Sequence, residues 1–192
     1  MDADYSIELG GDDPVLDVPW TDPSGRLAHV DLKTHPESLL EVEEAAQYTE
    51  LGEFLRSVNS AHSVFESAKC DAWATTELTP EEEVFAASHK FGSYVDVVFS
   101  DAADRLAFSQ HEECVKRLVV LLRPAPEIAS SAEVCVRRCF YGVDGGIREG
   151  FYFTLYVSGY GNDEAWARKN WAIAMKLVEN AMTQLSIGAS RG

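Results

Sequence analysis

The sequence of 192 residues lacks any apolar run that could cross a membrane. No uninterrupted apolar stretch approaches the about 20 residues that a transmembrane helix needs. The first five residues, from Met1 to Tyr5, contain neither the basic nor the apolar region of a signal peptide. We therefore expect a cytoplasmic protein that does not contact a membrane.

Cysteine is also scarce, and its spacing does not suit a metal or a disulfide framework. A chain of this length buries about 70% of its unfolded surface and folds without covalent staples. Cys135 and Cys139 are four residues apart on an expected strand, which separates them by about 13 Å, too far to share a metal without a bulge. We expect reduced thiols and no metal at the four cysteines, Cys70, Cys114, Cys135 and Cys139.

The motifs of common catalytic sites are absent. The sequence has no Gly-x-Ser-x-Gly elbow and no Walker loop. The segment from His111 to Cys114 begins like a zinc-protease helix, but Val115 stands where the second histidine should be. Gly159-Tyr160-Gly161 lies before an expected helix, yet Asp163 and Glu164 follow it and would repel a phosphate. We expect no cofactor, and we interpret the glycines as a strand break before a helix capped by Asn162.

Basic residues are few, and this scarcity limits the partners. The chain has 16 basic and 32 acidic residues, a net charge of −16. Residues 1–123 hold 25 acidic and 9 basic side chains, whereas residues 124–192 hold 7 of each. Such a field opposes nucleic acid and anionic lipid, so we expect neither as a partner. It favours a basic protein partner, although acidity also serves solubility alone.

The sequence shows clear hydrophobic periodicity of both the helical and the strand type, and this pattern predicts an α+β protein. We expect an antiparallel sheet of about five strands, with helices mainly on one face, in the order β-α-β-β-α-β-β-α. Asp144-Gly145-Gly146 is a turn signal between the last two strands. The expected strands are 26–33, 67–77, 90–100, 133–141 and 151–158, and the expected helices are 34–59 (interrupted at 48–49), 109–123 and 162–185.

One domain is expected over residues 25–188. Residues 1–24 hold seven acidic side chains, no basic one, and several glycines and prolines. This composition predicts a flexible N-terminal tail, in which Val15, Leu16, Val18 and Trp20 could attach its end to the domain. Residues 189–192 are expected to form a C-terminal tail.

The last six elements predict two ββα units that arose by duplication. The segment Gly92–Ser100 aligns with Gly150–Ser158, matching at glycine, tyrosine and serine positions and in hydrophobic character at most others. Strands drawn from the same residue preferences would also produce part of this similarity.

Strand alternation sorts the side chains into two faces, and one face is a candidate binding surface. The first face is small or aliphatic, includes Ala68, and suits packing under helices. The second face mixes aromatic rings with charges of both signs, as ligand clefts do, although it could equally be the wet face of an antiparallel sheet. The predicted ligand-binding residues are Lys69, Asp71, Trp73, Tyr94, Asp96, Arg137, Tyr152 and Tyr156.

This surface leaves three classes of function open. We favour a binding module for a small molecule or a basic protein. A small enzyme is the first alternative, with Asp71 or Asp96 as a general base near Arg137, although no motif supports it. A homo-oligomer that uses Trp73 and the tyrosines as its interface is the second. A register slip of one residue would exchange the two faces.

Overall fold

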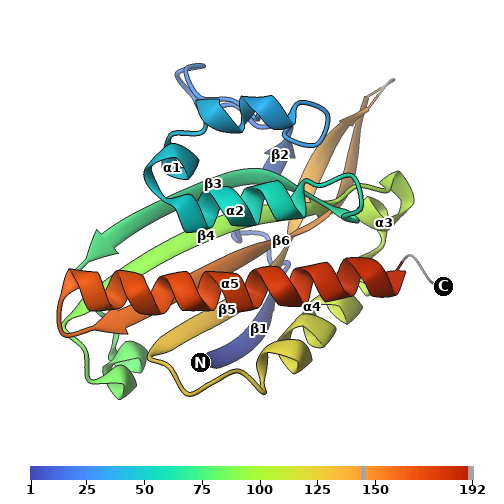
Figure 1. Cartoon of the computed structure of the whole chain (residues 1–192). Helices are drawn as coiled ribbons and strands as arrows, with labels where there is room; N and C mark the ends of the chain where they lie inside the picture. The colour runs from blue at the N-terminus through green and yellow to red at the C-terminus, as the bar shows by residue number, and fades with distance from the viewer. Residues whose placement is uncertain (144–145, 190–192) are drawn as a thin grey trace.

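The structure is a computed structural model that describes residues 1–143 and 146–189. Its centre is a six-stranded, mostly antiparallel sheet in the order β1-β5-β6-β4-β3, with β2 beside β5 (Figure 1). The strands are β1 (Asp2–Glu8), β2 (Leu16–Val18), β3 (Phe65–Thr75), β4 (His89–Phe99), β5 (Ser130–Val143) and β6 (Gly146–Gly161). The helices are α1 (Glu43–Gln47), α2 (Thr49–Val58), α3 (Ala102–Leu106), α4 (Phe108–Leu122) and α5 (Glu164–Ala189), and the short 3₁₀ helices are η1 (Pro36–Glu41) and η2 (Pro80–Phe85).

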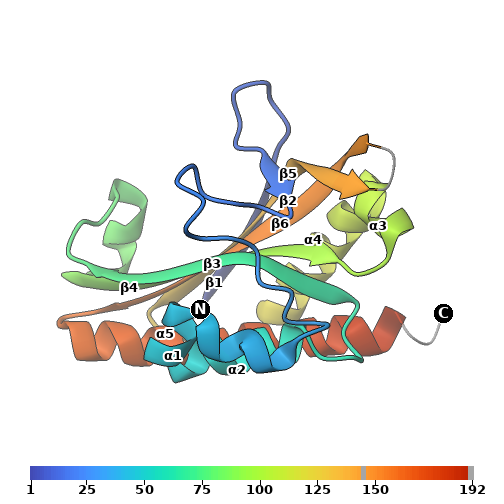
Figure 2. The same ribbon diagram turned by 90° about the horizontal axis from the view of Figure 1, so that it is seen from above.

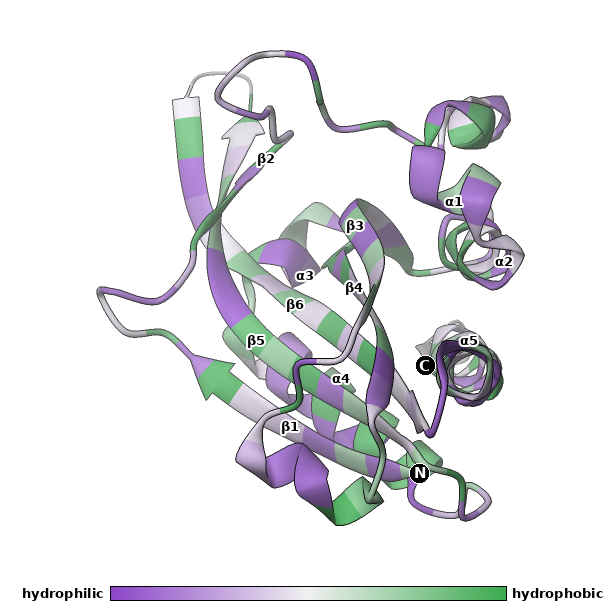
Figure 3. Cartoon of the chain, turned by 90° about the vertical axis from the view of Figure 1, so that its left-hand side faces the viewer, coloured by the Kyte–Doolittle hydropathy of each residue, from purple (hydrophilic) through white to green (hydrophobic). Residues whose placement is uncertain are grey.

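The main helices form a layer against one face of the sheet. Helix α5 lies along β6 and β4, α2 packs beside α5, and α4 packs against β1, β5 and α5. Figures 2 and 3 show α1, α2 and α5 together on the same side of the sheet. The segment between β1 and η1 runs over the opposite side (Figure 2). The main core therefore lies between sheet and helices, and the other face, here called the open face, is left to this segment and to solvent.

Periodicity predicts an α+β protein, and the structure confirms helices with a mostly antiparallel sheet. It does not confirm the expected element order, because two strands, β1 and β2, precede the first helix. The apolar stripe predicted on α2, formed by Leu51, Phe54, Leu55 and Val58, is fully buried in the main core. The helical region is interrupted at Tyr48, which precedes α2, as the sequence suggests. The sheet has one more strand than the five expected, and the duplication stays a prediction.

The N-terminal segment corrects the sequence interpretation, because it is not a tail. Asp2–Glu8 forms β1 and pairs in parallel with β5, from Asp2 beside Ser131 to Glu8 beside Arg137. Tyr5 packs against the main core, while Asp2 and Asp4 face outward. Within β1, the acidic residues Asp2 and Asp4 therefore mark the exposed side of an edge strand and not disorder. The expected attachment is present at Leu16, Val18 and Trp20, but not at Val15, which is exposed.

The strand expected at 26–33 is also wrong. Asp22 accepts hydrogen bonds from the backbone amides of Ser24 and Leu27, and these bonds fold the segment into a turn. A single bridge between Thr21 and Ala28 is the remaining extended pairing there. Local hydrogen bonds between a side chain and the backbone thus favour a turn here, although the weak alternation of the sequence predicts a strand.

Gly159 does not break β6, which continues to Gly161. A Cβ atom at Gly159 would lie 2.1 Å from the Trp171 backbone nitrogen and 2.3 Å from the Ala167 carbonyl oxygen. The glycine therefore lets α5 approach the sheet closely. The cap of α5 is Asp163, whose carboxylate accepts a hydrogen bond from the Trp166 amide at 2.8 Å, and not Asn162.

Two expectations fall wholly or partly outside the described residues. The turn at 144–146 includes 144–145, and the C-terminal tail at 189–192 includes 190–192; α5 extends to Ala189. Among the helices of the described residues, none combines the length and the apolarity that crossing a membrane requires. The cellular compartment stays a prediction.

Candidate functional site

All eight predicted site residues lie on the open face. The strand register places Lys69 beside Asp96, Asp71 beside Tyr94, Tyr94 beside Tyr156 and Arg137 beside Tyr152. Trp73 follows on the same side of β3 and contacts the Tyr94 ring. The alternate residues, such as Val95, Val97 and Phe153, lie in the main core with the helices. The predicted separation into two faces is therefore correct for these residues.

One residue assigned to the helix face is misplaced, because β3 contains a bulge. The pairing of β3 with β4 shifts between Ser67 and Lys69. An extra residue in one strand reverses the alternation on that side of the bulge. Ala68 consequently joins a second, smaller hydrophobic cluster on the open face, with Val98, Cys139, Tyr141 and Tyr152.

A hydrogen-bonded chain of polar side chains crosses this face. The Thr154 hydroxyl donates to Oδ1 of Asp96 at 2.6 Å. Nη1 of Arg137 donates to the Thr154 hydroxyl at 3.1 Å and to the Tyr156 hydroxyl at 2.8 Å. Nε of Arg137 donates to the Glu8 carboxylate at 2.7 Å. Asp96 and Arg137 are only 6% and 9% exposed, so the chain of bonds is a buried part of the sheet.

Burial changes the protonation of this network. Removal from water raises the pKa of Asp96 to about 6, against the opposing effects of the Thr154 bond, Lys69 and Arg137. The pKa of Glu8 is lowered, mainly by its hydrogen bond from Arg137. Glu8 is therefore an ionised partner for Arg137, whereas Asp96 changes its charge close to neutral pH.

A row of aromatic rings lies across three strands next to this network. The ring centroids of Trp73 and Tyr94 are 6.4 Å apart, and those of Tyr94 and Tyr156 are 6.2 Å apart. Arg137 lies over the Tyr156 ring at 5.5 Å. Nζ of Lys69 lies 5.7 Å from the Tyr94 ring centroid and 5.2 Å from that of Trp20. The row combines apolar contact area with fixed cations.

The N-terminal segment covers part of the predicted surface. Leu16 and Val18 pack against the cluster that contains Tyr152, and Tyr152 is 3% exposed. Tyr152, Asp96 and Arg137 are therefore supporting residues beneath the surface and not contacts that a ligand reaches directly. The accessible predicted residues are Lys69, Asp71, Trp73, Tyr94 and Tyr156.

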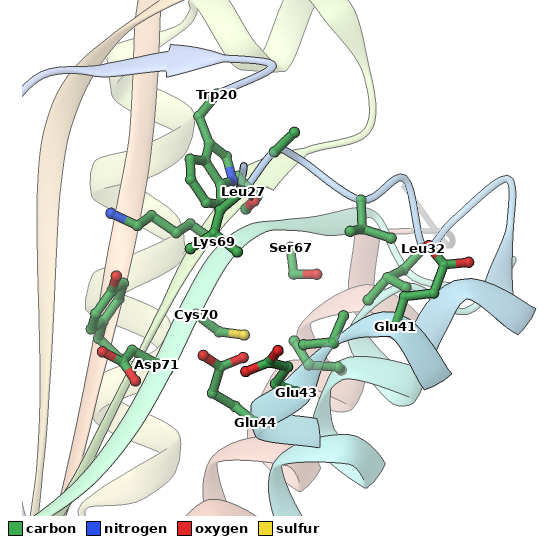
Figure 4. A pocket seen from close by; sticks show the side chains of 16 residues that line it. Trp20, Leu27, Leu32, Glu41, Glu43, Glu44, Ser67, Lys69, Cys70 and Asp71 are labelled. Atoms are coloured by element: carbon green, nitrogen blue, oxygen red, sulfur yellow. Dashed lines mark hydrogen bonds between the residues drawn. The ribbon is translucent and has the colours of Figure 1, made fainter. Parts of the chain in front are cut away.

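The accessible part opens into a cavity of about 380 Å³ beside β3. Figure 4 shows Trp20 and Lys69 at one side, Cys70 and Ser67 along β3, and Glu43 and Glu44 rising from the helical layer toward them. The volume lies within the range of about 300–1,000 Å³ of small-ligand sites. Three of the predicted residues line it: Lys69, Asp71 and Tyr94.

The cavity has an acidic wall that sequence reasoning missed. Glu41, Glu43, Glu44 and Asp71 line it, against one base, Lys69. The three glutamates come from the end of η1 and the start of α1. Burial, with the nearby Glu44 charge, raises the pKa of the Cys70 thiol to about 12. The one available signal was the acidic run from 41 to 44, which alone resembles an ordinary solvated helix start.

Neither a metal centre nor a relative supplies a function. In residues 1–143 and 146–189, no three His, Cys, Asp or Glu side chains lie together as metal ligands. Comparisons of the chain with protein-family models, with curated proteins and with solved structures find no match. Function is therefore inferred from the chemistry of the site alone.

Proposed function

We propose that the protein is a binding module whose ligand carries positive charge and occupies the cavity beside β3. The observation that carries this proposal is the acidic lining of the cavity, where Glu41, Glu43, Glu44 and Asp71 outnumber the single base, Lys69, whose ammonium group already lies against Trp20 and Tyr94. Aromatic faces attract cations, and carboxylates form the strongest hydrogen bonds with them. A ligand ammonium or guanidinium group would meet carboxylates here, in a cavity whose lining also includes Trp20 and Tyr94.

The net charge supports the same class of ligand. The elements that form the cavity all lie in residues 1–123, which carry the whole charge excess. A cleft lined by one sign of charge concentrates ligands of the opposite sign and speeds their association. The same charge argues against a nucleic acid partner.

Titration calorimetry with spermine at low salt tests the proposal. We expect saturable binding to the unmodified protein that weakens steeply with added salt, because the attraction is largely electrostatic. The double variant Glu43→Gln, Glu44→Gln should bind at least about tenfold more weakly, the effect of losing about 1.4 kcal/mol.

The matched control is Glu81→Gln, Glu83→Gln, which removes the same charge from exposed positions of η2 outside the cavity. An equal loss of spermine affinity in both double variants would show that net charge alone causes the effect, and it would contradict a site at the cavity.

An enzyme with Asp96 as general base is the second candidate, because the pKa of Asp96 is raised to about 6. Against it, Asp96 is buried, does not line the cavity, and already accepts the Thr154 hydroxyl. Asp71 is exposed and accepts a hydrogen bond from the Ala72 amide. Carbon-detected NMR can monitor the titration of the Asp96 carboxyl group. If Asp96 acts as a general base, its pKa should shift when spermine saturates the cavity, and an unchanged pKa would contradict the second candidate.

A further inference from the structure

The cavity runs along the outer edge of β3. Among the strands of residues 1–143 and 146–189, β3 is the last of the sheet and pairs only with β4. The five consecutive residues Ser67–Asp71 all line the cavity. Neighbouring side chains of a strand point to opposite faces, so a cavity that touches every residue in turn must lie against the edge of the backbone. These five residues span about 13 Å at the usual strand rise.

The first half of this edge is closed by the protein's own side chains. Nζ of Lys33 donates to the carbonyls of Ser63 and Phe65 at 2.6 and 2.9 Å. The Ser67 amide donates to Asn59 at 3.0 Å, and the Trp20 indole donates to the Ala68 carbonyl. Capping of this kind is how proteins protect an edge strand.

The second half, beyond the bulge, is not closed in this way. The Ser100 amide donates to the Val64 carbonyl. In an antiparallel pair, positions bonded to the partner strand alternate with positions whose backbone groups point outward. When this alternation is followed from Val64 across the bulge, the backbone groups of Cys70, Ala72 and Ala74 point away from β4. In the described part of the chain, one hydrogen bond is found at these outward groups: the Ala72 amide donates to the Asp71 carboxylate at 2.7 Å. Their side chains are small, so they leave room for another backbone.

We infer that the outer edge of β3 accepts an extended segment of another protein that carries lysine or arginine side chains, as an additional strand. This inference rests on the proposed function and names its ligand. The partner's backbone would pair with Cys70, Ala72 and Ala74, in the mode of strand addition. Its alternate side chains would point toward the helical layer, where Glu43 and Glu44 face β3 across the cavity (Figure 4).

Charge decides between the occupants that an edge strand can have. A second copy of this chain would bring another acidic edge, because Asp71 lies on β3 itself and the chain carries a net charge of −16. Like charges at such short separation disfavour that pairing. A basic segment neutralises the wall that it meets.

An eight-residue peptide of alternating lysine and threonine tests the inference by fluorescence anisotropy and amide hydrogen exchange. We expect it to bind and to slow the exchange of the Cys70, Ala72 and Ala74 amides at least tenfold. Two control peptides have the same sequence but are N-methylated at the odd or at the even residues, so that each keeps its charge and loses half of its backbone donors. We expect at least one of these two peptides to bind tenfold more weakly.

Two controls separate this inference from the proposal beneath it. Glu43→Gln, Glu44→Gln should weaken the unmethylated peptide tenfold, and Glu81→Gln, Glu83→Gln should leave its affinity unchanged. Equal affinity for both methylated peptides, or no added protection in β3, would overturn strand addition, while spermine binding would still support a cationic site. Failure of spermine as well would overturn both. A dimer with protected β3 amides in the absence of peptide would assign the edge to a second copy and also overturn the inference.

Discussion

At the scale of single residues, Asp96 couples the open face to pH. Its carboxyl group is buried between β3 and β6, with Lys69 beside it, and its pKa rises from 3.8 to about 6 on folding. The folded protein therefore holds this proton more tightly than the unfolded chain does. The stabilising contribution of the protonated carboxyl is complete below pH 3.8 and is lost as the pH rises through about 6.

The variant Asp96→Asn should remove this pH dependence. Relative to the unmodified protein, its free energy of unfolding should increase by about 2 kcal/mol between pH 4 and pH 7, because most of the about 3 kcal/mol carried by a two-unit pKa shift is lost in this range. Asparagine still offers an oxygen to the Thr154 hydroxyl. Urea unfolding across this range measures the difference, and a difference that stays constant with pH would contradict a raised pKa.

Arg137 should be irreplaceable by lysine. Its guanidinium group serves Glu8, Thr154 and Tyr156 at once. A lysine keeps the charge but cannot reach three partners in that fork geometry. We expect Arg137→Lys to lower the free energy of unfolding by about 2 kcal/mol, measured by urea unfolding at pH 7.

The control for this substitution is Arg123→Lys, at an exposed position after α4. It should change stability by less than about 0.5 kcal/mol. Similar effects at both positions would show that the network contributes nothing specific.

The residues of the site were predictable only in part. Alternation with a period of two was sufficient to place Lys69, Tyr94 and Arg137 on one face. It could not show that residues 16–18 would bury Tyr152, because that contact joins segments more than 130 positions apart in the chain. Nor could it show that Trp20 would reach Lys69, since no local pattern encodes such a distant approach.

At the scale of elements, β1 is an integral edge of the sheet. It pairs with β5 over seven residues, and its Glu8 holds Arg137. Deletion of residues 1–8 should therefore lower the free energy of unfolding by roughly 3 kcal/mol or more, from lost apolar burial and the unpaired arginine. It should also promote self-association through the bared edge of β5.

Urea unfolding and size-exclusion chromatography with light scattering measure these two effects. An unchanged stability and a monomer would restore the interpretation of this segment as a tail. The charge-only variant Asp2→Asn, on the outward side of β1, should behave like the unmodified protein.

The contact between α5 and β6 depends on Gly159. A methyl group there would overlap backbone atoms of Trp171 and Ala167, which cannot move aside without shifting the helix. We expect Gly159→Ala to lower the free energy of unfolding by about 3 kcal/mol. A Cβ at Gly11 meets nothing within 4 Å, so Gly11→Ala is the control. Equal thermal midpoints for the two variants would contradict this close packing.

Elements with strong periodicity were predictable, and weak ones were not. The stripe on α2 and the alternation in β4 follow from packing against a single core. Strand β1 was hidden by its acidic outward residues, and the turn at Asp22 was hidden because it depends in part on hydrogen bonds to a side chain. The glycines near the end of β6 are needed for the close approach of α5, but in the sequence they resemble a loop.

At the scale of the whole molecule, the acidic residues 1–123 build the cavity, and the neutral residues 124–192 build much of its support. Segments 20–32 and 41–44 and strand β3 supply most of the lining. Strands β5 and β6 and helix α5 supply the neighbouring sheet and the layer beneath it. Net charge could be computed from the sequence, but its concentration around one cavity requires the fold.

The most direct test of the central claim is an amide NMR titration of ¹⁵N-labelled protein with spermine. We predict saturable shifts concentrated at the residues that line the cavity, which are five positions from Trp20 to Leu32, residues 41–44 and 67–71, Leu55 and Tyr94. Shifts that follow the acidic residues 81–83 instead, or that do not saturate, would show a diffuse charge effect and contradict a binding site beside β3.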